Sequence, residues 1–151
     1  MRPRNFLAAL LGVSTGSPTV AANFDTPESA VQALEAAYVH KDIEAAVAAK
    51  DFHEEARLML QKMNPGLATD AGILKQTSQV LELSFRDQIR KNGFPKFADL
   101  RCSIIAKQQV SPTLVRLTEQ CVFADGGTSS QDLFTFKGAA GWRVVVVPRN
   151  S

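Results

Sequence analysis

Residues 102–121 read CSIIAKQQVSPTLVRLTEQC, and this stretch decides the fold. Two runs rich in β-branched and apolar residues flank a turn at Ser111-Pro112, which is typical of a β-hairpin. A symmetric turn at that point places Cys102 directly opposite Cys121. Opposed Cβ atoms on neighbouring strands lie about 4.5–5.5 Å apart, close to disulfide reach. The register therefore predicts a structural disulfide, with two reduced core cysteines as the alternative.

One face of this hairpin is largely apolar in the same register. It carries the two cysteines and six further side chains, namely Leu100, Ile104, Ala106, Val115, Leu117 and Phe123. Because side chains alternate between the two faces of a strand, we expect this face to be buried.

Glu119 is the exception on that face, where it lies opposite Ile104. A carboxylate that faces a core needs a partner, water or a cavity. It is therefore either a pocket acid with a raised pKa, or it pairs with Arg143, or a bulge turns it outward. Asp132 is a weaker candidate, because a turn centred on Gly126-Gly127 would place it beside Cys121.

The rest of the chain divides into helices followed by strands. Capping residues and apolar spacing of three or four predict helices over residues 26–41, 43–49, 51–64 and 70–91. Turn residues separate predicted strands at about 98–109, 114–124, 129–137 and 142–148. This order indicates an α+β fold, with N-terminal helices packed on one face of a four-stranded antiparallel sheet.

Residues 1–22, MRPRNFLAALLGVSTGSPTVAA, have the layout of a secretory signal. Arg2 and Arg4 precede an apolar run, and small residues end the segment with a cleavage position after Ala22. The run is too short to cross a bilayer as a helix, which takes about 20 residues. A transit peptide and a structural first helix are the alternatives. We expect export to the periplasm or the medium, and one domain over residues 23–151.

Charge and motifs exclude several classes of function. The chain has 17 basic and 15 acidic side chains, and its signal-like segment contains two arginines and no acid. The remainder is neutral, which argues against a nucleic-acid partner. His40 and His53 do not have metal-ligand spacing, and Gly126-Gly127 is a hairpin turn rather than a phosphate loop. We therefore predict no metal, no cofactor and no membrane span.

Three stretches of the chain resemble the nuclear transport factor 2-like superfamily. They are TPESAV from Thr26, AAYVHKDIEAA from Ala36, and FTFKG followed by GWRVV from Phe134. The chain departs from the pattern between Asp51 and Leu67, where a capped helix replaces an early strand. The resemblance implies a curved α+β cone. Its members include isomerases, dehydratases, epoxide hydrolases, ligand or partner binders, and immunity proteins that neutralise toxins.

The resemblance also bears on catalysis. Aligned on Asp42, the tyrosine of the isomerases falls on Leu34 and their catalytic carboxylate falls near Leu58, and neither residue transfers protons. The first hypothesis is therefore an exported, non-catalytic domain that binds a protein or a small apolar ligand, for example an immunity protein.

The second hypothesis is a small-pocket enzyme in which Glu119 or Asp132 is the general base. Under either hypothesis the expected pocket residues are Glu119, Tyr38, Phe134 and Trp142. A homodimer through the open sheet face is a further arrangement that such cones adopt.

Overall fold

The computed structural model describes residues 22–97 and 99–150. The predicted signal segment, up to residue 21, lies outside the described residues. Four α-helices come first, namely α2 (Pro27–Val39), α3 (Ile43–Ala48), α4 (Phe52–Met63) and α5 (Ala71–Asn92), with a short 3-10 helix, η1 (Leu67–Thr69), before the last. They are followed by β1 (Arg101–Ser111), β2 (Leu114–Val122), β3 (Thr128–Gly138) and β4 (Gly141–Val145).

Side-chain caps start the helices where the sequence predicts them. Thr26 and Ser29 form a reciprocal capping box at the start of α2, with Pro27 at the first helical position. Three aspartates accept a backbone N–H at the starts of α3, α4 and α5, namely Asp42, Asp51 and Asp70. Each cap satisfies a backbone donor that has no partner within the helix.

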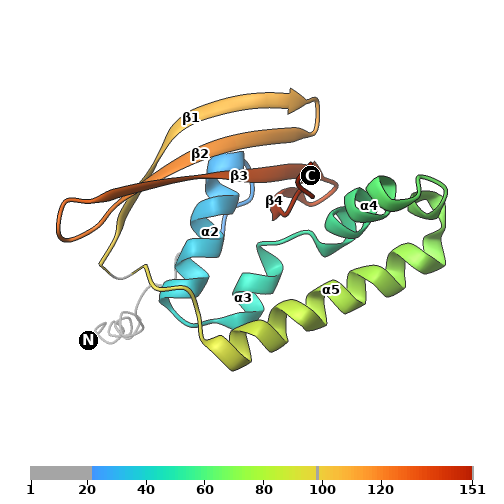
Figure 1. Ribbon diagram of the computed structural model, residues 1–151, viewed down its shortest axis with the longest axis horizontal. Helices are drawn as coiled ribbons and strands as arrows, with labels where there is room; N and C mark the ends of the chain where they lie inside the picture. The colour runs from blue at the N-terminus through green and yellow to red at the C-terminus, as the bar shows by residue number, and fades with distance from the viewer. Residues whose placement is uncertain (1–21, 98, 151) are drawn as a thin grey trace, which may run out of the picture.

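The strands form one open antiparallel sheet in the order β1-β2-β3-β4. The helices lie on one side of this sheet, with α5 beyond α3 and α4 beside the end of the sheet near β4 (Figure 1). The α+β fold class is therefore confirmed. Cys102 pairs with Cys121 across the first hairpin, and the two form a disulfide.

The predicted register of this hairpin holds as far as the pairing of Ile104 with Glu119, then shifts by one residue at Ile105 and by another at Val110. Ser111 pairs with Leu114, so the predicted turn centre between Ser111 and Pro112 is wrong and the turn lies at Pro112-Thr113. Ile105 is the extra residue of a β-bulge, so Ala106 pairs with Thr118 and is exposed. The expectation that Ala106 faces the core is wrong, because one inserted residue moves the side chains that follow it to the other face. Lys107 takes the inward position and its ammonium lies 3.3 Å from the Glu28 carboxylate.

The last strand is shorter than predicted, since β4 ends at Val145 rather than at residue 148. Pro148 has no N–H to contribute to a ladder. The segment instead turns toward α4, where the Lys62 ammonium donates to the carbonyl of Arg149. As a result, β4 pairs with β3 only from Phe134 onward, and the first half of β3 has no strand on that side.

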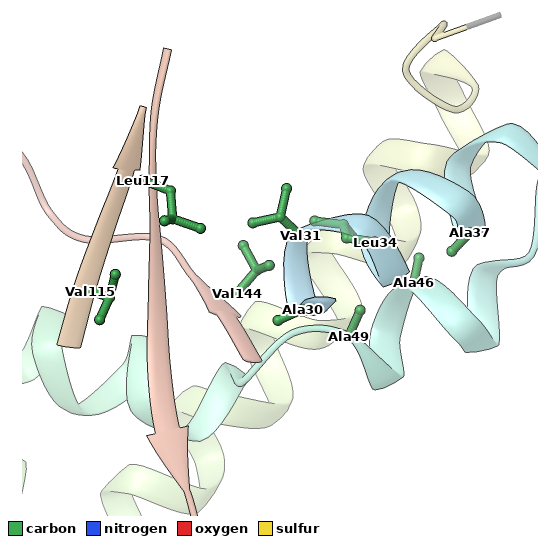
Figure 2. Packing of buried hydrophobic residues seen from close by; sticks show 9 residues of the cluster. All are labelled: Ala30, Val31, Leu34, Ala37, Ala46, Ala49, Val115, Leu117 and Val144. Carbon is green, nitrogen blue, oxygen red and sulfur yellow. The ribbon is translucent and has the colours of Figure 1, made fainter. Parts of the chain in front are cut away.

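The main core lies between α2, α3 and the inner face of the sheet (Figure 2). Alanines bring the two helices close together, while valines and leucines fill the space toward β2 and β4. The buried members are Ala30, Val31, Leu34, Ala37, Ala46, Ala49, Val115, Leu117 and Val144. Gly141 is required at the rim, because a Cβ there would lie 2.6 Å from the carbonyl oxygen of Phe24.

The α4–α5 hairpin has a small core of its own, made of Ala56, Leu60, Ala68 and Leu74. Leu74 is the only buried residue of α5. Two apolar side chains on α5, Val80 and Leu83, are 63% and 65% exposed. Part of the apolar pattern that predicts α5 therefore faces solvent rather than the core.

Candidate functional site

A cavity of about 760 Å³ opens between α2, the first half of β3 and the segment that follows β4. Its walls are mainly apolar and include Val31, Leu34, Leu133, Phe134 and Val144–Val147. Glu35 and Tyr38 face it from α2, and Lys50 faces it from the connection between α3 and α4. A concave, largely apolar site with a few polar groups is the usual form of a ligand pocket.

Glu119 lies behind this cavity, on the inner face of β2. It is 1% exposed, and its carboxylate accepts a 2.9 Å hydrogen bond from the Gln131 side-chain amide. The inward orientation follows from the register, but the expected partner Arg143 is wrong. The Arg143 guanidinium instead stacks 3.6 Å from the ring centroid of Phe24 and donates to nearby backbone carbonyls.

Glu35 lines the cavity and forms a hydrogen bond with the buried Glu119. Burial, a hydrogen bond with Glu119 and the charge of Glu119 together raise the pKa of Glu35 from 4.5 to about 8. At neutral pH the Glu35 carboxyl therefore keeps its proton, and its O–H donates a hydrogen bond to the Glu119 side chain. The two carboxyl groups therefore share the Glu35 proton in one hydrogen bond.

A second polar group lies on the same side of α2. The Lys50 ammonium is 2.6 Å from the Glu55 carboxylate, and the two side chains are only 7% and 9% exposed. The ammonium also lies over the rings of Phe52 and Phe85, at 5.3 and 5.4 Å from the ring centroids.

Tyr38 is a third polar group at the cavity. Burial and the charge of Glu55 raise the pKa of Tyr38 to about 12, so this phenol stays neutral and can donate a hydrogen bond.

The remaining predicted pocket residues divide between the cavity and other places. Phe134 and Asp132 both line the cavity. Asp132 pairs with Thr118, whose hydroxyl donates to it at 2.8 Å, so the expected position beside Cys121 is wrong. The reason is that Ser129 occupies that place in the register. Trp142 is not among the cavity residues and packs on the main core instead.

One cluster in the described part of the chain has the composition of a metal site. It consists of Cys102, Cys121 and Glu119, whose potential ligand atoms lie within 4.8 Å of one another. The two sulfurs are bonded to each other, however, so the cluster offers no thiolate to an ion. The carboxylate of Glu119 is also engaged by Gln131 and Glu35.

No family model, no curated protein and no solved structure matches this chain. Among the described residues, no helix combines the length and the apolar character that crossing a membrane requires. The disulfide is compatible with an oxidising, exported location.

The Glu35–Glu119 pair makes stability depend on pH. The pKa of Glu35 is 4.5 in the absence of these contacts and about 8 in the folded chain, so the folded state binds the proton more tightly. We expect the contribution of Glu35 to the free energy of unfolding to be largest below about pH 4.5 and to fall as pH rises toward 8.

Urea denaturation of the wild type and of Glu35→Gln between pH 4 and 9 measures this effect. Glutamine keeps the hydrogen bond to Glu119 without a titrating proton. As pH rises, the urea midpoint of the wild type should therefore fall relative to the midpoint of Glu35→Gln. Parallel curves over the whole range would contradict the shared proton.

Proposed function

We propose that this chain is an exported, non-catalytic binding domain whose ligand site is the cavity beside α2 and β3. The observation that carries the proposal is an open, mainly apolar cavity with a protonated Glu35 at its wall and Glu119 behind it. Apolar walls provide affinity, and a small number of fixed polar groups orient the ligand. The ligand is a small apolar molecule or part of a protein partner, and an immunity-type role is one version of the second.

The groups at the cavity favour binding over covalent catalysis. Among the described residues that line it, there is no histidine and no cysteine, so Ser130 has no imidazole base in the cavity. Lys50 is held by Glu55, so its ammonium is not a free nucleophile. The resemblance to nuclear transport factor 2-like proteins, which include non-catalytic binders, supports the same proposal.

Filling the cavity tests the proposal. Val146 lines the cavity and is 61% exposed, so Val146→Trp places bulk at the cavity without disturbing the core. Val110→Trp is the matched control, because Val110 is 49% exposed on β1 and is not a cavity residue. With the full chain and Nile red as an apolar fluorescent probe, we expect saturable binding that weakens about tenfold or more in Val146→Trp and is unchanged in Val110→Trp.

Two results would contradict this assignment. One is the absence of saturable Nile red binding to the wild type. The other is equal binding by the two tryptophan variants, which would place the probe on another apolar surface, such as the exposed side of α5.

A second candidate function is general acid–base catalysis, and the Glu35–Glu119 pair favours it specifically. A general base works best when its pKa lies near the working pH, and the pKa of Glu35 is about 8. Incubating the protein with small ketones in D₂O, and following deuterium uptake at the α-carbon by NMR, detects such a base. Uptake that disappears in both Glu35→Gln and Glu119→Gln would replace the binding function with this one.

A further inference from the structure

We propose that the cavity is the docking site of an extended polypeptide segment of a partner protein, which adds as a strand to the free edge of β3 and extends a basic side chain toward Glu35. The inference rests on the proposed binding function and names the class of its ligand. Adding a strand to an exposed sheet edge is an established mode of peptide recognition, in which main-chain hydrogen bonds give affinity and side-chain pockets give specificity.

The free edge follows from the early end of β4. Lys137 donates its backbone N–H to Thr113, so the odd-numbered residues of this part of β3 turn their backbone groups toward β2. The even-numbered residues turn theirs to the other side, where β4 covers Phe134 and Phe136. Ser130 and Asp132 continue that series beyond the end of β4. Their outward N–H and C=O groups have no ladder partner among the described strands.

The cavity lies directly beside this edge. Ser130 and Asp132 line it on the β3 side, and Val146, Val147 and Arg149 line it on the other, where the chain has left the sheet. An added strand would therefore occupy the space in which β4 would have continued. Because side chains alternate, every second residue of that strand would point toward α2, on the same face as Gln131.

The row of side chains across the sheet predicts what that residue should be. Ile104, Glu119 and Gln131 are neighbours on three adjacent strands, and the residue of an added strand opposite Gln131 would be the next in the row. Glu35 contacts Glu119 from α2 and lines the cavity. Two cationic side chains of the described residues line the cavity: Lys50 is already paired with Glu55, and Arg149 belongs to the wall opposite β3. A lysine or arginine of the partner would complement the carboxyl pair in both charge and hydrogen bonding.

Asp132 adds selectivity at the edge itself. A charged side chain on an edge strand discourages pairing with unrelated chains. It also favours a segment with a basic residue over an acidic one, because like charges across a strand pair are unfavourable.

Selection of a phage-displayed random peptide library on the full chain tests the proposal. The edge variant is Ser130→Pro, which removes one outward N–H and is tolerated where no strand pairs on that side. Ser130→Ala keeps the N–H and is its matched control. We expect enriched sequences to share a lysine or arginine. A synthetic enriched peptide should bind Ser130→Pro about tenfold or more weakly than the wild type and Ser130→Ala, and it should bind Glu35→Lys, whose ammonium would neutralise Glu119, equally weakly.

N-methylation of the synthetic peptide gives a measurement that does not depend on any protein variant. Because one edge of the peptide would face β3, methylation at alternate residues should abolish binding and methylation at the intervening residues should not. Failure to enrich any sequence, equal tolerance of methylation at all positions, or full binding to Glu35→Lys would overturn the inference. If Nile red still binds in the cavity while peptides do not, the binding function stands and only the peptide class is wrong.

Discussion

Replacing Lys50 with methionine is expected to lower the free energy of unfolding by about 3–5 kcal/mol. Lys50 and Glu55 form a buried ion pair at 2.6 Å, and methionine retains most of the apolar length of lysine. The change therefore leaves the Glu55 carboxylate in a poorly solvated site without its cation, and the contacts of the ammonium with Phe52 and Phe85 are lost as well. Urea denaturation at pH 7 measures the effect.

Two further variants show that the loss comes from the stranded charge. Lys50→Met combined with Glu55→Leu removes both charges and should recover most of the stability, because an apolar pair of similar volume often replaces a buried ion pair without loss. Lys91→Met removes one partner of the exposed pair with Asp87 and should not change the midpoint measurably. If Lys50→Met were as stable as Lys91→Met, the Lys50–Glu55 pair would be hydrated in solution.

The register at the cysteine end of the first hairpin was predictable, because a slip of one residue there would turn the apolar side chains to the other face. The pairing of Cys102 with Cys121 and the inward position of Glu119 both follow from it. The bulge at Ile105 was not predictable, because Ile104 and Ile105 are both apolar β-branched residues and either fits the pleat. The end of β4 was predicted too late for a similar reason, since Val144–Val147 all favour strands.

Glu35 shows what the sequence analysis missed at the candidate site. Val31, Leu34 and Tyr38 form the apolar stripe of the first helix, at spacings of three and four residues. Glu35 occupies the remaining position of that stripe, four residues after Val31, and the helix geometry therefore turns it toward the sheet. An acidic residue within an apolar stripe was the signal for it. Its contact with Glu119 joins two elements far apart in the sequence, so only the fold reveals the shared proton.

Removing the disulfide with Cys102→Ala and Cys121→Ala together is expected to cost about 3 kcal/mol of stability. The bond joins residues separated by 19 positions, and closing a loop of that length restricts the unfolded chain by about this amount in the chain-entropy account. Alanine avoids placing a hydroxyl beside the carboxylate of Glu119. The measurement is the urea midpoint of the double variant against that of the oxidised wild type.

The reduced wild type separates the effect of the bond from that of the lost sulfur atoms. If the cross-link acts on the unfolded chain, the wild type in excess reductant should lose most of the same 3 kcal/mol, since its side chains are otherwise unchanged. The hairpin itself should persist in both proteins, because its backbone ladder and the buried Val115 and Leu117 do not depend on the cysteines. A reduced wild type as stable as the oxidised one would mean that this bond contributes only to local geometry.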